Sequence, residues 1–103
     1  MPIQYDFRGK IALITGSSRG IGKGLALRFA ADGADLVINY KKNHELAEGV
    51  AAEIRAMGRR ALPIQADIEN PDDIRRMFAQ VKEVFGGLDI LVASASRLMV
   101  ASR

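Results

Sequence analysis

The chain has 103 residues, of which 49% are hydrophobic and none is cysteine, and a formal net charge of +3 at pH 7, which suits one domain with its own core. The lack of cysteine excludes disulfides and thiolate metal sites and is compatible with a reducing cytoplasm, where we expect the protein to act. Its apolar runs are no longer than a strand, and residues 1–10 lack the apolar core of a signal peptide, so we expect no membrane partner.

The first half of the chain predicts two strands, each followed by a helix. Residues 11–15 are apolar and form the first expected strand, and a glycine-rich turn leads from it into a helix that ends near Asp32. A short turn then precedes a second apolar strand at 35–40. The next helix is expected to begin near Asn43 and to end at Gly58, because apolar residues recur at helical spacing between them.

The second half continues this alternation. Residues 61–65 predict a third strand, and Asn70 followed by Pro71 predicts the capped start of a third helix. A glycine pair ends this helix before a fourth strand at 89–92. The alternation predicts an α/β fold, a Rossmann-like doubly wound parallel sheet with helices on both faces. The buried face of the third helix is expected to consist of Ile74, Met77, Phe78, Val81 and Phe85.

The residues between the first strand and the first helix have the pattern TGxxxGxG. Such glycines let the backbone approach a pyrophosphate, while free N–H groups and the positive end of the helix dipole attract the anion. A triphosphate loop of the Walker type is excluded, because it needs other residues where the chain has Ser17 and Gly24. The alternative is a glycine-rich turn without a ligand. The predicted cofactor-binding residues of this turn are Gly16, Ser18, Arg19, Gly20, Ile21 and Gly22.

Four segments within residues 7–95 resemble the short-chain dehydrogenase/reductase family. They are the lead-in FRGK, the turn TGSSRGIG, the pair Asp67 and Ile68 after the third strand, and the fourth-strand sequence LDILV. The resemblance implies a nicotinamide-dependent oxidoreductase whose strands lie in the order 3-2-1-4. Within the family the chain looks most like bacterial 3-oxoacyl or enoyl reductases that act on acyl carrier protein. That likeness implies a role in fatty acid biosynthesis, although sugar and steroid enzymes share this N-terminal half.

The end of the second strand bears on the choice of cofactor. A carboxylate there would hydrogen-bond the ribose 2′-hydroxyl of NAD, whereas a basic residue favours the 2′-phosphate of NADP. The chain has Tyr40 and Lys41 at this place, and the resemblance adds Arg19 as a second group that reaches the 2′-phosphate. We therefore expect NADP(H) as the cofactor. The alternative is that Lys41 and Lys42 only solvate a loop.

The resemblance also assigns residues to other parts of the cofactor site. Asp67 should accept a hydrogen bond from the adenine amino group, with Ile68 packed beside the ring, although Asp67 could instead only cap the following turn. After the fourth strand the family usually has NNAG, whereas residues 93–96 read ASAS. Ala93 and Ala95 keep the small size that lines the cofactor. The asparagine that ties neighbouring strands is absent, so we expect a less rigid sheet at this point.

The family's catalytic residues have no match in this chain. The family needs a tyrosine, a lysine four residues later and a serine that holds the carbonyl, but Tyr5 is followed four residues on by Gly9 and Tyr40 by His44. His44 is expected at the start of a surface helix without partners, and we predict no catalytic residue and no metal site. Two interpretations stay open. The chain is the cofactor-binding half of an NADP-dependent oxidoreductase that transfers hydride to or from a carbonyl or enoyl substrate, or it is a non-catalytic nucleotide-binding module or truncation remnant. Alone, it is expected to be inactive.

Partners and oligomeric state follow from the same features. The full-length relative should act on a small molecule or a carrier-bound acyl group, and no nucleic acid is expected, because acids and bases are interleaved without regularly placed aromatics. We assign residues 1–96 to the cofactor domain and 97–103 to a tail of unknown structure. The fourth strand then lies at the sheet edge, where unpaired N–H and C=O groups predict self-association or a homo-oligomer. A soluble monomer would instead indicate that the tail folds back over this strand.

Overall fold

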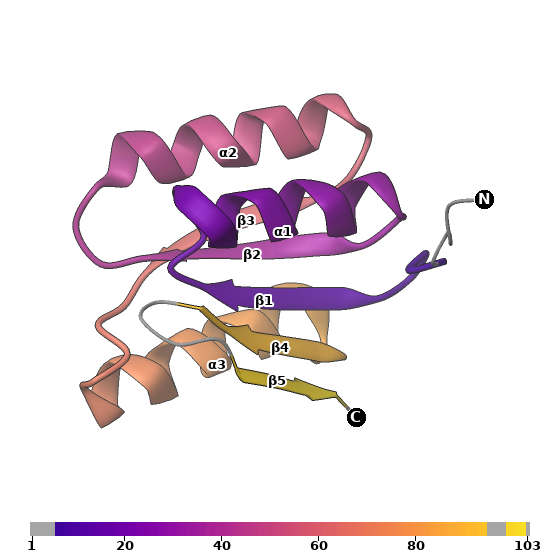
Figure 1. The fold of residues 1–103 in the computed structure, drawn as a ribbon. Helices are drawn as coiled ribbons and strands as arrows, with labels where there is room; N and C mark the ends of the chain where they lie inside the picture. Colours follow the sequence, from indigo (N-terminus) through magenta and orange to yellow (C-terminus); the bar gives the residue numbers. More distant parts are fainter. Residues whose placement is uncertain (1–5, 95–98, 103) are drawn as a thin grey trace.

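A five-stranded sheet forms the centre of the computed structural model, which describes residues 6–94 and 99–102 (Figure 1). The strands are β1 (Ile11–Thr15), β2 (Asp35–Tyr40), β3 (Ala61–Gln65), β4 (Ile90–Ala93) and β5 (Met99–Ser102). They lie in the order β3-β2-β1-β4-β5, and the pairs among β1 to β4 are parallel. The predicted Rossmann-like sheet with strand order 3-2-1-4 is therefore confirmed.

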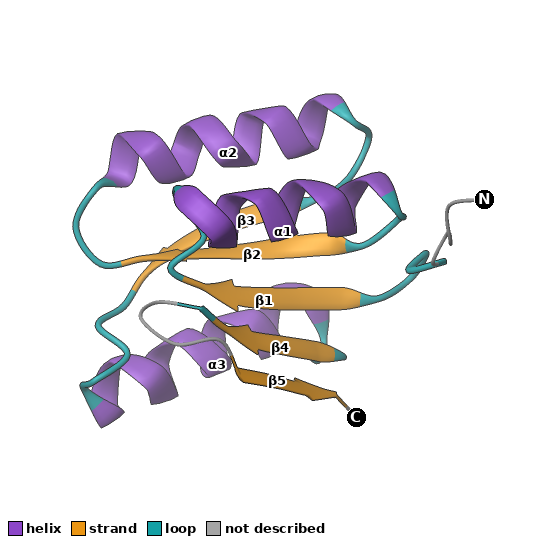
Figure 2. Ribbon diagram, viewed as in Figure 1, coloured by secondary structure: helices purple, strands orange, loops and turns teal. Residues whose placement is uncertain are grey.

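Three helices in the described residues cover the two faces of the sheet (Figure 2). They are α1 (Gly20–Ala31), α2 (His44–Ala56) and α3 (Pro71–Phe85). The helices α1 and α2 pack on the face that carries Ile14, Leu36 and Ile38, and α3 packs on the opposite face, over Leu13 and Val37. Because both faces are covered, β1 and β2 need apolar residues at successive positions. None of the helices in this part of the chain is long and apolar enough to cross a membrane.

The starts of α2 and α3 and the end of α3 lie at the capping residues that the sequence indicates. The Asn43 side chain accepts a hydrogen bond at 3.0 Å from the N–H three residues later, and the Asn70 side chain accepts from the N–H groups of Asp72 and Asp73. Gly86 ends α3 in the left-handed conformation, with a φ of 83°. Local side-chain chemistry therefore sets the helix boundaries.

The buried face of α3 is narrower than predicted. Met77 and Val81 are buried, with Phe85 packed beside them, and Ile74 is half-buried. Phe78 is exposed, so its assignment to the core is wrong. Successive residues of a helix are rotated by about 100°, and Phe78 is therefore turned away from the line of Met77 and Val81 that meets the sheet.

The tail pairs with the fourth strand. β5 runs antiparallel to β4, with Ile90 opposite Ser102 and Ala93 opposite Met99. The expectation that the fourth strand forms the open sheet edge is therefore wrong, because residues 99–102 supply its backbone partners. These residues belong to the sheet rather than to a separate tail. Self-association through this edge stays a prediction, and it would require β5 to leave β4.

We predict that a chain ending at Ser96 associates more strongly than the 103-residue chain. Removing residues 97–103 takes the antiparallel partner from β4 and leaves unpaired N–H and C=O groups along its edge. Sedimentation velocity at micromolar concentration compares the two chains, and circular dichroism shows whether both are folded. A folded short chain that sediments as a monomer would contradict the protective role of β5.

Candidate functional site

A tight turn at the carboxyl end of β1 forms the centre of the candidate site. Gly16 and Gly20 have φ values of 60° and 61°, in the left-handed region that residues with a Cβ avoid. A Cβ on Gly22 would lie 2.3 Å from the carbonyl oxygen of Gly16, so α1 rests directly on the turn. All three glycines of the motif are therefore required by the backbone, two for its conformation and one for its close packing.

The amino end of α1 is open to a ligand. In the part of the chain that the structure describes, Arg19 precedes the helix without capping it by its side chain, and the first turn holds no acidic residue. The first N–H groups of a helix have no partner within it and carry the positive end of its dipole. Arg19 is exposed, Ile21 is 75% exposed and Ser18 is half-buried at this turn. Backbone donors beside an exposed guanidinium suit a phosphate.

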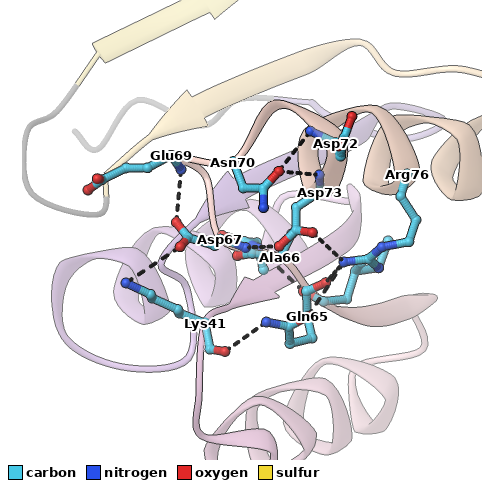
Figure 3. Close-up of polar contacts among 11 residues, drawn as sticks. Lys41, Gln65, Ala66, Asp67, Glu69, Asn70, Asp72, Asp73 and Arg76 are labelled. Carbon is cyan, nitrogen blue, oxygen red and sulfur yellow. Dashed lines mark hydrogen bonds and ion pairs between the residues drawn. The ribbon is translucent and has the colours of Figure 1, made fainter.

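The loops that follow β2 and β3 contact each other through a lysine and an aspartate (Figure 3). Lys41 Nζ lies 3.7 Å from Asp67 Oδ2, and the other carboxylate oxygen of Asp67 accepts the Glu69 N–H at 2.9 Å. One carboxylate oxygen of Asp67 therefore caps the following turn, and the other lies beside the Lys41 ammonium group. The two side chains are 59% and 34% exposed, so this ion pair is weak and open to exchange with a ligand.

A chain of polar contacts holds the Lys41 loop in place (Figure 3). Gln65 Nε2 donates to the Lys41 carbonyl oxygen at 3.0 Å, and the Arg76 guanidinium donates to the Gln65 carbonyl oxygen at 2.8 Å. Arg76 also lies 3.6 Å from the Asp73 carboxylate, which accepts the Asp67 N–H at 2.9 Å. The loop after β2 is thus fastened to β3 and to the start of α3. Sequence patterns alone do not indicate these contacts.

Tyr40 and His44 form a pair at the end of β2. The Tyr40 hydroxyl lies 2.7 Å from His44 Nδ1, so the expectation that His44 has no partner is wrong. The reason is that α2 begins at His44, close enough to bring its ring back to the strand end. The Tyr40 side chain is 9% exposed and belongs to the core under α1 and α2. Its role as a cofactor contact stays a prediction.

Ser94 joins the ends of β4 and β1. Its N–H donates to Thr15 Oγ1 at 2.9 Å, and its hydroxyl donates to the Thr15 carbonyl oxygen at 2.5 Å. A serine therefore links the two strand ends where the family's asparagine is absent, and the expected lower rigidity of the sheet stays a prediction. Ala93 is half-buried in β4, and Ala95 lies outside the described residues.

Sequence patterns do not single out two buried polar residues, Ser17 in the turn and Asn39 in β2. Ser17 and Asn39 are 0% and 2% exposed. The Asn39 side chain accepts the Gly16 N–H at 3.2 Å, and the Ser17 hydroxyl donates to the Ile14 carbonyl oxygen at 2.7 Å. The sequence does contain one signal for Asn39, which follows three apolar residues of the strand. A buried amide in such a place must find hydrogen-bond partners.

The arrangement brings complementary chemistry to one edge of the sheet. The open helix end follows β1, Lys41 follows β2, and Asp67 with the half-buried Ile68 follows β3. Together these groups can hold a phosphorylated nucleotide, since they offer N–H groups that donate hydrogen bonds to an anion, a basic side chain and a hydrogen-bond acceptor. Within the described ranges, no group of three or more side chains is placed to hold a metal ion.

Comparisons with known proteins agree with this geometry. A family model described as short chain dehydrogenase matches residues 10–102. A hydroxynaphthalene reductase-like protein of Metarhizium anisopliae is 47% identical over 84% of this chain and 33% of its own length. The versicolorin reductase of Emericella nidulans is 43% identical over 88% of the chain and 34% of its own length. A short chain dehydrogenase from Burkholderia cenocepacia, solved in complex with NADP, is 55% identical with a TM-score of 0.82, over 85% of this chain and 36% of its own.

We predict that Gly22→Ala lowers the free energy of unfolding by about 3 kcal/mol or more, because the new Cβ would overlap a backbone oxygen that cannot move aside. Gly24→Ala is the matched control in the same helix, where a Cβ meets nothing within 4 Å. Alanine is favoured over glycine in a helix by about 1 kcal/mol, so this variant should be at least as stable as the parent. Urea unfolding followed by circular dichroism compares them. Equal stability of the two variants would contradict the close approach of α1.

Proposed function

The chain belongs to the short-chain dehydrogenase family, and we propose that it forms the cofactor-binding part of an NADP-dependent oxidoreductase. The observation that carries this proposal is the glycine turn with its open helix end, on the same sheet edge as Lys41 and Asp67. The nicotinamide of the bound cofactor would supply or accept a hydride. The chain spans about a third of the length of the relatives it matches, so the activity of a whole enzyme is part of the proposal.

The turn fits the pyrophosphate of a dinucleotide. The glycines at 16, 20 and 22 leave the backbone free to approach the phosphates, and the N–H groups at the start of α1 would donate to them. Ile21 is exposed at this place and would lie against the cofactor. At the other end of the nucleotide, Asp67 would accept from the adenine amino group, and Ile68 would pack beside the ring.

The charges at this sheet edge favour NADP over NAD. β2 ends in Tyr40 and is followed by Lys41, so the end of this strand carries a base in place of the carboxylate that would bind a ribose 2′-hydroxyl and repel a 2′-phosphate. Lys41 would exchange its weak ion pair with Asp67 for the 2′-phosphate, and the exposed Arg19 would add forked hydrogen bonds. The similar Burkholderia protein contains NADP, which supports the same choice.

The proposed reaction of the whole enzyme is hydride transfer to or from a carbonyl or enoyl group. One fungal relative is named a hydroxynaphthalene reductase-like protein and the other a versicolorin reductase. Their names support reduction, but they lend no support to an acyl-carrier substrate or to fatty acid biosynthesis. In this chain Ala93 would flank the cofactor.

A nucleotide-binding module without catalysis is the second candidate function. It is favoured by the sequence, which has no tyrosine followed four residues later by lysine. Such a chain would bind NADP(H) through the same turn and the same bases. A hydride acceptor beside it would have no positioned proton donor, so the charge that develops on oxygen would stay uncompensated.

We predict that Arg19→Ala weakens NADPH binding about tenfold or more and leaves NADH binding nearly unchanged, because a hydrogen bond to a charged group contributes about 1.5–3 kcal/mol. Arg28→Ala is the control, since Arg28 lies in the last turn of α1 and pairs with Asp32. Fluorescence titration of both cofactors measures the affinities. An equal loss for NADPH and NADH would show that Arg19 does not read the 2′-phosphate.

We also predict that the 103-residue chain binds NADPH without oxidising it in the presence of carbonyl or enoyl substrates. The physical reason is the missing proton donor. Loss of NADPH absorbance over time is the measurement, with the Gly16→Val variant as a control that should not bind cofactor. Oxidation that depends on substrate and disappears in Gly16→Val would overturn this prediction and support catalysis by the chain itself.

A further inference from the structure

A buried asparagine lies where three segments of the candidate site meet. Asn39 is 2% exposed and occupies the next position after Val37 on the α3 side of β2, because side chains alternate along a strand. The neighbouring positions Leu36, Val37 and Ile38 are apolar. Burying a carboxamide in such a strand costs free energy unless its hydrogen bonds are made. An asparagine at this position is therefore explained by its hydrogen bonds rather than by apolar packing.

The side chain of Asn39 contacts the first residue of the glycine turn and the end of β3. Its Oδ1 accepts the Gly16 N–H at 3.2 Å. Its Nδ2 donates to the carbonyl oxygens of Ile64 and Ala66, at 3.4 and 3.2 Å. Ala66 directly precedes Asp67. One side chain thus contacts both the phosphate-binding turn and the segment that carries the adenine-binding carboxylate.

The backbone of Asn39 ties the same turn a second time. Its N–H donates to Ser17 Oγ at 3.1 Å, and its carbonyl oxygen accepts the Ser17 N–H at 3.0 Å. The N–H groups of Gly16 and Ser17 are therefore both used inside the protein. A phosphate at this turn has to be held by the N–H groups that follow, from Ser18 to Gly22.

We propose that Asn39 is a positioning residue that fixes the phosphate-binding turn relative to the Asp67 segment, so that one nucleotide is held at both ends at once. This inference rests on the proposed binding of NADP(H). When two contacts to one ligand are held at the correct separation, the second forms at a high effective concentration. A site whose two halves shift relative to each other loses this gain, even when each half still binds its own part of the ligand.

The test compares two fragments of the cofactor on the full 103-residue chain. Adenosine 2′-phosphate would contact the Asp67 segment and the side chains of Lys41 and Arg19, whereas adenosine 2′,5′-bisphosphate adds the 5′-phosphate that would lie against the N–H groups of the turn. Asn39→Leu keeps the number of side-chain heavy atoms, although its methyl groups need more room, and it removes all three side-chain hydrogen bonds. Val37→Ala is the matched control, since it weakens the same strand from the same face and leaves the hydrogen bonds intact. All affinities are measured where unfolding curves show every variant to be folded.

We expect the affinity gained from the 5′-phosphate to fall about tenfold in Asn39→Leu, while adenosine 2′-phosphate binding changes by less than about twofold. In Val37→Ala the gain should equal that of the parent chain, although the variant is less stable. An unchanged gain in Asn39→Leu would overturn the inference and leave Asn39 a purely structural residue. Failure of the parent chain to bind the bisphosphate at all would instead overturn the proposed function.

If Asn39→Leu does not fold, amide exchange and NMR titration of the parent chain decide the question. The Gly16 N–H should exchange slowly, because it is bonded to Asn39 Oδ1. Its resonance should also shift less on addition of the bisphosphate than the resonances of residues 18–22. A Gly16 amide that exchanges rapidly, or that shifts as much as those of the following residues, would contradict the proposal.

Discussion

The contact between α1 and the turn that precedes it constrains the rest of this structure. A Cβ on Gly22 would lie 2.3 Å from the Gly16 carbonyl oxygen, so the helix is as close to the turn as a backbone allows. The other buried residues of α1 are Ala26 and Ala30, which are small and fully buried. Four-residue spacing places the three on one face, so the whole helix lies close to the sheet. Its amino end is thereby aimed at the carboxyl edge, where an anion would bind.

The parallel sheet explains why the other site residues gather at the same edge. Lys41 follows β2 and Asp67 follows β3, and the carboxyl ends of parallel strands point the same way. From β3 the chain crosses to the opposite side of β1 and forms β4. The strand order therefore reverses between β1 and β4, at the carboxyl ends of these two strands. Ligands of open α/β sheets bind at such a point. The hydrogen bonds between Thr15 and Ser94 hold this part of the edge together.

The groups proposed to hold the pyrophosphate, the adenine and the 2′-phosphate come from the turn and from the loops after β2 and β3. The relatives extend to about three times the length matched here, and the sequence of this chain lacks the family's tyrosine and lysine pair. The proposed binding of a dinucleotide therefore needs only groups of this chain, whereas the proposed reduction needs a proton donor that this sequence does not match.

Most of the fold and the centre of the site could be predicted because they depend on residues close together in sequence. The glycine spacing determines the turn, and Asn43 and Asn70 determine where α2 and α3 begin, since a cap acts on the next two or three N–H groups. The alternation of apolar runs also determines the doubly wound sheet. These features need no knowledge of distant partners.

Tertiary structure alone decided the contacts between residues far apart in the chain. Asn39 meets Gly16 across 23 positions, and Ser94 meets Thr15 across 79. The pairing of β5 with β4, which makes β5 the edge strand in place of β4, is a further contact of this kind. A polar side chain or a short apolar tail shows that a partner is needed but does not identify it. The partner is decided by which strand ends the folded backbone brings together, because hydrogen bonds act only over about 3 Å.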